Sequence, residues 1–351
     1  MSLPTTLPEP VIPRLVGGPT LRWGVLAPGF IAGVFASTLH RNTDQRIAAV
    51  ASRSAERAET FARSHGIDRS YDDYRALVDD PGIDIVYVAA PHTEHLALAT
   101  LALEAGKHVL VEKPIAASAD EARRIAEAAR AAGRFAMEAM HTRFHPRMTV
   151  IERLLADGAL GELRLVQAEL GLGNVPVDPT SRLYDPALGG GAALDLGVYP
   201  LWFHDFVLGA PTRLDVSGTL AVTGVEDQWN ATLHHDDGAT GEIAATMRTW
   251  TPSHAAIGGA EGRIHLDSRH PQPGGFTVYD VRNQPVSRFD DETGVVGTDG
   301  LCRQAAWAAQ HIADGLLESP LHPLATSIRV LETVDGVRAG LGAAPIGEDA
   351  A

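Results

Sequence analysis

The strongest constraint on the fold of this chain is a regular alternation of short apolar strands and helical patterns between Leu21 and Met140. Glycine and proline turns separate the segments, and each helical pattern leads into another apolar strand. Repeated β-α units of this length predict a parallel, doubly wound sheet with right-handed crossovers. The expected strands are residues 21–27, 46–51, 83–89, 107–111 and 134–137, and the expected helices are residues 30–39, 54–65, 93–105 and 118–132.

The pattern changes after His145, where strand-like segments follow one another without long helices between them. Short turns rich in glycine and aspartate, such as residues 235–238, join these strands and predict an antiparallel sheet. The expected strands are residues 163–170, 214–222, 227–234, 240–248, 262–267 and 276–281, and the expected helices are residues 148–156, 191–208, 304–317 and 325–339. We therefore predict the α/β class, with an N-terminal arm at residues 1–20, a nucleotide-binding domain at residues 21–142 and an α+β domain with an open sheet at residues 143–351.

Composition restricts the partners that this chain can bind. The formal net charge of −15 argues against nucleic acid or an anionic membrane surface, because both require a basic face. Cys302 is the only cysteine, so an internal disulfide cannot form, which fits a reducing cytosol. No apolar run approaches the roughly 20 residues of a membrane-spanning helix, and residues 1–18 lack the pattern of a secretory signal. We expect a cytoplasmic protein that acts on a small molecule.

The first β-α turn, Gly24–Gly33, has the spacing of a phosphate-binding turn. Ala27, Gly29 and Ala32 occupy the three positions of the G-x-G-x-x-G/A pattern, so its first glycine is missing. Gly29 allows the backbone to approach a pyrophosphate, and the helix that starts at Phe30 and Ile31 presents free N–H groups. A tight turn without a ligand has the same local pattern. Its position after the first strand of a long β-α series favours cofactor binding at Gly29, Phe30 and Ile31.

The end of the second expected strand indicates which dinucleotide binds. An NAD enzyme usually carries Asp or Glu there to hold the ribose hydroxyls, whereas this chain has Ser52 and Arg53. Ser52 can donate to a phosphate, and Arg53 can hold a phosphate with two hydrogen bonds. The alternative is that Arg53 is only the exposed start of a charged helix. We predict NADP as the preferred cofactor, with NAD as the second candidate.

A lysine stands at the carboxyl end of the fourth expected strand, within Glu112–Pro114. Ligands of open α/β sheets bind just outside the carboxyl ends of the strands. An acidic residue, a basic residue and a proline are consecutive there. Lys113 is therefore a candidate for a role in a reaction, rather than a lysine that only faces solvent.

A second unusual segment, Gly189–Pro200, begins with a glycine run and continues as a helical pattern. Asp195 and Tyr199 are spaced i, i+4 and therefore share one helix face. A tyrosine near a lysine and an acid can transfer a proton, as hydride chemistry on an alcohol requires. The alternative, which the segment alone favours, is a packed tyrosine whose hydroxyl bonds Asp195.

Taken together, Trp23–Ala32, Glu112–Pro114 and Gly189–Tyr199 resemble the Gfo/Idh/MocA oxidoreductase family, and the resemblance extends from about Leu21 to Gly340. It implies an N-terminal Rossmann domain and a C-terminal domain whose open, mainly antiparallel sheet often mediates dimers. It also implies hydride exchange between a nicotinamide and a sugar, polyol or related alcohol. A homodimer or higher homo-oligomer is expected on the same ground.

Tyrosine at position 199, where many members carry histidine, resembles one branch of this family. That branch contains dimeric dihydrodiol dehydrogenase, NADP-dependent aldose 1-dehydrogenases and glucose–fructose oxidoreductase. The resemblance implies that Lys113 and Tyr199 are a catalytic pair, in which Lys113 bonds the reacting oxygen and favours ionisation of Tyr199, the general acid/base. Asp195 would orient the substrate or the tyrosine.

Further site residues follow from the same resemblance. Residues 138–146 are similar to the branch and imply that Arg143 lies near the cofactor and substrate. Pro91, His92, Glu112 and Lys113 are expected to contact the cofactor. The candidate substrate contacts are Lys113, Asp195, Tyr199 and His204. His141 and His145 have the i, i+4 spacing of metal ligands, but no third ligand is placed by the sequence, so no metal site is expected.

The expected function is an NADP-dependent oxidoreductase that transfers hydride between nicotinamide and an aldose, polyol or related cyclic alcohol. Three alternatives remain among enzymes: a trans-dihydrodiol dehydrogenase, a keto-sugar reductase, and an oxidoreductase that retains its nucleotide and cycles it between two substrates. An alternative of another class is a cofactor-binding sensor or repressor without turnover. Such a sensor has no need of the pair Lys113 and Tyr199, which this chain carries.

Overall fold

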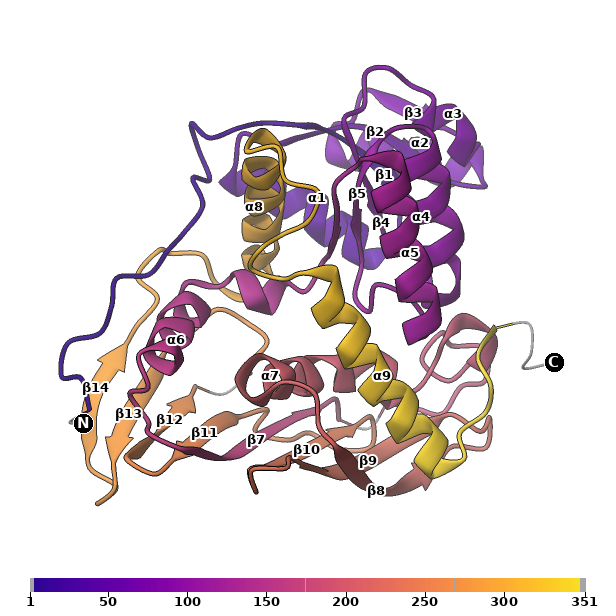
Figure 1. Cartoon of the computed structure of the whole chain (residues 1–351). Helices are drawn as coiled ribbons and strands as arrows, with labels where there is room; N and C mark the ends of the chain where they lie inside the picture. Colours follow the sequence, from indigo (N-terminus) through magenta and orange to yellow (C-terminus); the bar gives the residue numbers. More distant parts are fainter. Residues whose placement is uncertain (1–2, 174, 268, 348–351) are drawn as a thin grey trace. The chain divides into compact units, whose positions relative to one another are not determined.

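Six parallel strands form the sheet that the N-terminal alternation predicts (Figure 1). Their order is β3-β2-β1-β4-β5-β6, so the direction of winding reverses between β1 and β4, where ligands of such sheets bind. The strands are β1 (Arg22–Leu26), β2 (Arg46–Ala51), β3 (Arg69–Tyr71), β4 (Ile85–Val88), β5 (His108–Val111) and β6 (Ala136–Glu138). Only β3 was not predicted, because a strand of three residues carries too little pattern.

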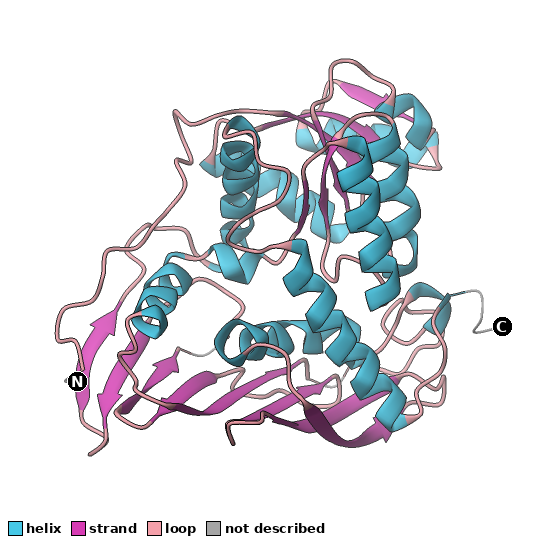
Figure 2. Cartoon of the chain, in the orientation of Figure 1, coloured by secondary structure: helices cyan, strands magenta, loops and turns pink. Residues whose placement is uncertain are grey.

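Helices cover both faces of this parallel sheet, as the doubly wound class requires (Figure 2). The α-helices are α1 (Phe30–Asn42), α2 (Ala55–His65), α3 (Tyr74–Val78), α4 (His95–Glu104) and α5 (Ala119–Ala132); η1 (His92–Glu94) and η2 (His141–Phe144) are short 3-10 helices. Polar side chains cap the starts of α2, α3 and α5. At α5, Ser118 Oγ accepts from Glu121 N at 3.3 Å, and the Glu121 carboxylate accepts from Ala117 N at 3.0 Å.

The computed structural model describes residues 3–173, 175–267 and 269–347, and these residues form two compact units. The parallel-sheet unit contains Ile12–Phe144 and, in addition, Gly297–Ile328, which we had expected in the second domain. This segment comprises η5 (Gly297–Gly300), α8 (Leu301–Ala313) and the start of α9 (Leu324–Leu341). It joins the parallel-sheet unit because Thr38 Oγ1 of α1 donates to Asp299 O at 3.0 Å and Ala136 N of β6 donates to Leu317 O at 3.0 Å.

The expected N-terminal arm also divides between the units. Up to Val11 it belongs to the second unit, where Val11 N donates to Thr149 Oγ1 at 2.9 Å. From Ile12 it belongs to the parallel-sheet unit, where Gly17 N donates to Asp44 Oδ2 at 2.7 Å.

The second unit, here called the open-sheet unit, is built on eight strands in the order β14-β13-β12-β11-β7-β10-β9-β8. All neighbouring pairs are antiparallel except β7 and β10, which run parallel. The strands are β7 (Leu163–Gly171), β8 (Arg213–Leu220), β9 (Glu226–His234), β10 (Thr240–Thr246), β11 (Ala255–Gly259), β12 (Gly262–Leu266), β13 (Phe276–Asp280) and β14 (Pro285–Phe289). The prediction missed β11, which is mostly Ala and Gly, and β14, an edge strand that starts at proline.

One face of this sheet is covered by helices α6 (Pro146–Ala156), α7 (Val198–Leu208) and the later part of α9 (Leu324–Leu341), as Figures 1 and 2 show. Along β9, Trp229, Ala231 and Leu233 are buried against these helices, whereas Gln228 and Asn230 are exposed on the opposite face. This alternation indicates a sheet with one packed and one open face. None of the helices in the described part of the chain has the length and apolar content needed to cross a bilayer.

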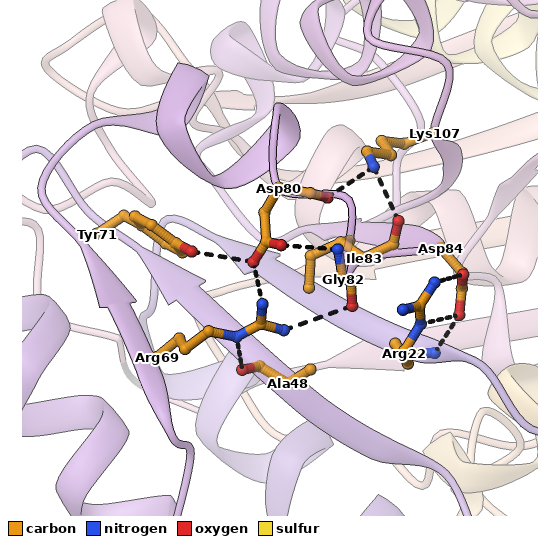
Figure 3. Close-up of polar contacts among 9 residues, drawn as sticks. All are labelled: Arg22, Ala48, Arg69, Tyr71, Asp80, Gly82, Ile83, Asp84 and Lys107. Atoms are coloured by element: carbon orange, nitrogen blue, oxygen red, sulfur yellow. Dashed lines mark hydrogen bonds and ion pairs between the residues drawn. The ribbon is translucent and has the colours of Figure 1, made fainter.

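A polar cluster stabilises the amino edge of the parallel sheet (Figure 3). The Asp80 carboxylate accepts from Gly82 N at 2.7 Å and from Tyr71 Oη at 2.9 Å. Lys107, just before β5, donates through Nζ to Asp80 O at 2.8 Å and to Ile83 O at 2.9 Å. Because ligands of such sheets bind at the opposite, carboxyl edge, this cluster has a structural role.

Candidate functional site

The turn between β1 and α1 can accept a pyrophosphate. Ala27 has a φ of 59°, so it keeps the left-handed backbone that the missing glycine would adopt without strain. Gly29 precedes α1 and would meet no atom within 4 Å if it carried a Cβ, so open space adjoins its backbone. The first turn of α1 contains no acidic residue and has no side-chain cap, and Phe30 is 87% exposed. The free N–H groups and the helix dipole therefore face a region that suits an anion.

The carboxyl end of β2 carries a hydroxyl and a guanidinium. Ser52 is buried and accepts from Ser54 N at 3.3 Å, while Arg53 is exposed. Burial raises the pKa of Tyr74, and the adjacent Arg53 opposes that shift. The end of β2 thus offers a cation where an NAD enzyme has a carboxylate.

Lys113 is the only residue between positions 109 and 117 that is not buried. It follows β5, and its peptide bond to Pro114 is cis. Glu112 is buried; its carboxylate accepts from Tyr87 Oη and, at 3.1 Å, from Lys113 N. Burial raises the pKa of Glu112, and the Tyr87 hydroxyl opposes the shift. Glu112 therefore shapes the backbone that presents Lys113.

His95 joins this loop to the neighbouring candidate segment at the end of β4. Its ring is fully buried, with Nδ1 2.9 Å from Pro114 O and Nε2 2.9 Å from Ala90 O. Burial lowers the pKa of His95. Pro91 and His92 follow β4, and Lys113 follows the neighbouring strand β5. Three residues predicted separately therefore lie just after adjacent strand ends of one sheet.

The basic composition contains a signal that motif analysis missed. Of the 29 lysine and arginine residues, only Lys107 and Lys113 are lysines, and the rest are arginines. Lys107 binds backbone carbonyls at the amino end of β5. Lys113 lies at the carboxyl end of the same strand. A compact ammonium and a planar guanidinium are not interchangeable, so lysine rather than arginine at position 113 favours a role that suits a compact cation.

In the open-sheet unit, Tyr199 is the only residue between positions 189 and 205 that is not buried. It stands at the start of α7, directly after a π-helical turn at Ala193–Gly197. Such turns are rare and occur often at functional sites. Asp195, in that turn, is buried and accepts from Arg182 Nη1 at 3.1 Å. Arg182 was missed from the sequence, because its loop has no periodic pattern.

The glycines before Tyr199 permit close packing on β9. Gly191 has a φ of 119°, and a Cβ there would lie 2.3 Å from Glu226 Oε1. The buried Glu226 accepts from Ala193 N at 3.0 Å and from Arg338 Nη1 at 2.8 Å. Burial raises the pKa of Glu226, and Arg338 opposes the shift. This ion pair anchors the first turn of the segment that carries Asp195 and Tyr199.

Two other residues that were predicted to contact cofactor or substrate are buried. Arg143, in the parallel-sheet unit, is 1% exposed and donates through Nε to Leu321 O at 2.6 Å. His204, in α7, packs on Gly241 of β10, and its Nε2 is 3.1 Å from His235 Nε2. Their contacts to cofactor and substrate stay predictions. Among the described residues, no group of three or more His, Cys, Asp or Glu side chains could hold a metal ion.

Fold and site together define a nicotinamide-dinucleotide-binding oxidoreductase. The model of the "Oxidoreductase family, NAD-binding Rossmann fold" matches residues 21–140, and that of the "GFO/IDH/MocA C-terminal domain" matches residues 148–265. The chain therefore belongs to the Gfo/Idh/MocA oxidoreductase family, which confirms the family resemblance, the fold class and the prediction of an oxidoreductase.

The relatives include trans-1,2-dihydrobenzene-1,2-diol dehydrogenases of Sus scrofa and Homo sapiens, which are 32% and 31% identical over 92% of this chain and 97% of theirs. A 3-ketoreductase from Actinomadura kijaniata, solved with NADP and TDP-benzene, is 28% identical over 92% of this chain and 98% of its own, with a TM-score of 0.77. The aldose-aldose oxidoreductase of Caulobacter crescentus, complexed with glycerol, shares the fold at 24% identity and a TM-score of 0.80, over 92% and 97% of the two chains.

The left-handed backbone of Ala27 predicts a stabilising substitution. A left-handed backbone at a residue with a Cβ costs about 1–2 kcal/mol of folding free energy, and glycine removes this cost. Glycine also gives the unfolded chain more freedom, which offsets about 0.5–1 kcal/mol of that gain. We expect Ala27→Gly to raise the thermal midpoint by about 1–2 °C. The matched control Ala32→Gly, inside α1, should lower it. An unchanged or lower midpoint for Ala27→Gly contradicts the assignment of strain.

The burial of His204 predicts acid sensitivity. Burial, and secondarily the charge of His235, lowers the pKa of His204 to about 4. The unfolded chain therefore binds more protons below about pH 6.5, and stability falls by roughly 2 kcal/mol between pH 7 and pH 5 on account of this group. His204→Gln should lose less stability over that range in calorimetry. His234→Gln, at the sheet surface, serves as control. If the parent protein and His204→Gln lose the same stability between pH 7 and pH 5, His204 is not the source of the acid sensitivity.

Proposed function

We propose that this protein is an NADP-dependent oxidoreductase that transfers hydride between nicotinamide and a sugar or diol. The observation that carries the proposal is the exposure of two side chains. In each of two otherwise buried motif segments, only the member of the expected proton-transfer pair, Lys113 or Tyr199, is partly exposed. A purely structural motif has no reason to leave a lysine and a tyrosine as its single accessible side chains.

The substrate class is supported by the relatives. The curated relatives are named for the oxidation of a cyclic trans-diol, and one of the structural relatives is a 3-ketoreductase. Both names describe reactions that interconvert a secondary alcohol and a ketone. We propose that this chain acts on a secondary or anomeric hydroxyl of a ring-shaped substrate.

In this proposal Tyr199 takes the proton from the substrate hydroxyl during oxidation and returns it during reduction. The Lys113 ammonium donates a hydrogen bond to the same substrate oxygen and favours the ionised form of Tyr199. The two groups act as a coupled pair. Asp195, held by Arg182, orients the substrate or the tyrosine.

The residues at the carboxyl edge of the parallel sheet suit a bound dinucleotide. Gly29 and the first N–H groups of α1 would hold the pyrophosphate, and Ser52 with Arg53 would hold the 2′-phosphate of NADP. Pro91, His92 and Glu112 would line the nicotinamide end. When bound, the nicotinamide supplies the hydride acceptor or donor.

We further propose that the chain works in a reducing cytosol, since its single cysteine, Cys302, is buried and unpaired with another thiol. The open face of the eight-stranded sheet is the surface through which we expect two copies to associate.

The choice of cofactor predicts the effect of removing one guanidinium. Loss of a charge-assisted contact to phosphate costs about 1.5–3 kcal/mol, so Arg53→Ala should weaken NADP binding by roughly 10- to 100-fold while NAD affinity changes by less than about threefold. Dissociation constants of the reduced forms, NADPH and NADH, measured through the fluorescence of their dihydronicotinamide, check this.

Arg63→Ala is the matched control, because Arg63 lies near the end of α2, the helix that begins two residues after Arg53. It should leave both affinities unchanged. If the parent protein binds NAD and NADP equally well, the NADP assignment is wrong.

The proton-transfer pair predicts large losses of turnover from two conservative substitutions. Lys113→Met and Tyr199→Phe should each lower kcat by about 10²-fold or more, with cofactor affinity nearly unchanged, because acid–base groups of this kind contribute about 10²–10⁴-fold. The assay is NADP reduction with trans-1,2-dihydrobenzene-1,2-diol, aldoses and polyols as substrates.

Lys107→Met is the matched control for the lysine, since it removes the same charge at the opposite end of β5. It should lower stability but leave kcat near the parent value. A Tyr199→Phe protein with near-normal turnover on its substrate would rule out this mechanism.

A further inference from the structure

A buried cluster of three polar side chains lies beneath the Lys113 loop and is not part of the proton-transfer pair. Glu138, at the end of β6, is 2% exposed, and His322 and Ser327 are each 1% exposed. Glu138 Oε2 accepts from Ser327 Oγ at 2.6 Å and contacts His322 Nε2 at 2.8 Å. All three residues belong to the parallel-sheet unit, although His322 and Ser327 follow Glu138 by more than 180 positions.

The same residue types form hydrolytic triads, but this geometry excludes that role. In a triad the acid and the nucleophile bond opposite nitrogens of the histidine. Here the Glu138 carboxylate and Ser327 Oγ both approach Nε2 of His322, and Ser327 is 3.2 Å from that atom. The cluster is also closed to substrate, because all three side chains are almost completely buried.

The remaining oxygen of Glu138 connects the cluster to the Lys113 loop. Glu138 Oε1 accepts from Ile115 N at 3.1 Å, two residues after Lys113. Burial alone would raise the pKa of Glu138, but the hydrogen bond from His322 and the other donors lower it. Glu138 is therefore an anion with both oxygens used, one toward His322 and Ser327 and one toward the loop backbone. Removing it would leave Ile115 N–H buried without this acceptor.

The segment that supplies His322 and Ser327 is itself tied to the sheet. Arg143 Nε donates to Leu321 O at 2.6 Å, directly beside His322. Ala136 N of β6 donates to Leu317 O at 3.0 Å. His322 N donates to Ser319 O at 3.2 Å. These bonds limit how far the cluster can shift, so they make Glu138 a rigid support.

We propose that Glu138, clamped by His322 and Ser327, is a positioning residue that holds the Lys113 ammonium in its working place through the Ile115 amide. This inference rests on the proposed function, in which Lys113 bonds the reacting oxygen. The returning segment Gly297–Ile328 thereby supplies two side chains that stiffen the loop bearing Lys113.

The first test is hydrogen–deuterium exchange of the protein without cofactor. In Glu138→Ala, the peptide covering residues 112–117 should exchange faster than in the parent, because the Ile115 amide loses its buried acceptor. In Glu138→Gln the amide oxygen still accepts from Ile115, so exchange should stay near the parent rate. Unchanged exchange in Glu138→Ala would overturn the proposal.

The second test separates positioning from general damage. With NADP and trans-1,2-dihydrobenzene-1,2-diol, Glu138→Ala should lower kcat by about 10- to 100-fold, with KM and NADPH affinity within about threefold. Small misplacements of a reacting group have effects of this size. Glu138→Gln should recover most of kcat. If Glu138→Ala does not fold, Ser327→Ala, which removes only one hydroxyl, should also lower kcat, but by a smaller factor.

A double-mutant cycle shows whether Glu138 acts through Lys113. In the Lys113→Met background, Glu138→Ala should lower kcat by less than about twofold further, since it acts through the missing ammonium. Equal effects in both backgrounds, or a Glu138→Ala protein with parental kcat, overturn the positioning role. If Lys113→Met itself keeps parental kcat, the proposed function fails instead.

Asp80→Asn is the matched control. Asp80 is also a shielded carboxylate of the parallel-sheet unit that accepts from a backbone N–H, but it lies at the amino edge (Figure 3). It should lower the thermal midpoint without changing kcat or the exchange of residues 112–117. A kcat loss in Asp80→Asn as large as in Glu138→Ala would show general damage rather than positioning.

Discussion

The backbones of the two motif segments depend on two buried carboxylates that must be satisfied by hydrogen bonds. Glu138 in the parallel-sheet unit and Glu226 in the open-sheet unit are each almost inaccessible to water. An unpaired charge in such a place costs several kcal/mol, so each carboxylate dictates the position of the groups around it. Glu138 accepts from Ile115 N beside Lys113, and Glu226 accepts from Ala193 N before Asp195. Each unit thus fixes the backbone of one motif by the same physical means.

The partners of these carboxylates come from the C-terminal part of the chain. Ser327 and Arg338 both lie in α9, with Ser327 grouped in the parallel-sheet unit and Arg338 in the open-sheet unit. Ser327 bonds Glu138, and Arg338 bonds Glu226. One helix therefore supplies a donor to the supporting carboxylate of each unit. A substitution in α9 can reach either motif without touching a ligand.

Few side chains of the two motif segments are accessible to solvent. Around Lys113 and around Tyr199 the neighbouring residues are buried, and the backbone is held by Glu112, His95 and the two supporting carboxylates. Lys113, one of the two lysines in this chain, supplies a compact ammonium. Catalysis by positioned groups requires this combination of a stiff scaffold and a small number of accessible polar atoms. Arg143 belongs to the scaffold in this sense, because it is buried and donates to a backbone carbonyl.

The sequence by itself determined the parallel sheet, most of the helices, the phosphate turn and the two motifs, because hydrophobic period, turn residues and caps are local properties. It also led to Lys113 and Tyr199, whose motifs are contiguous. Only the tertiary structure decided that Gly297–Ile328 joins the parallel sheet, and that Glu138 and Glu226 anchor the motifs. It alone revealed Arg182 as the partner of Asp195. The physical reason is that a hydrogen bond between residues far apart in the chain depends on how the elements pack, and neither partner carries a periodic pattern that records the other.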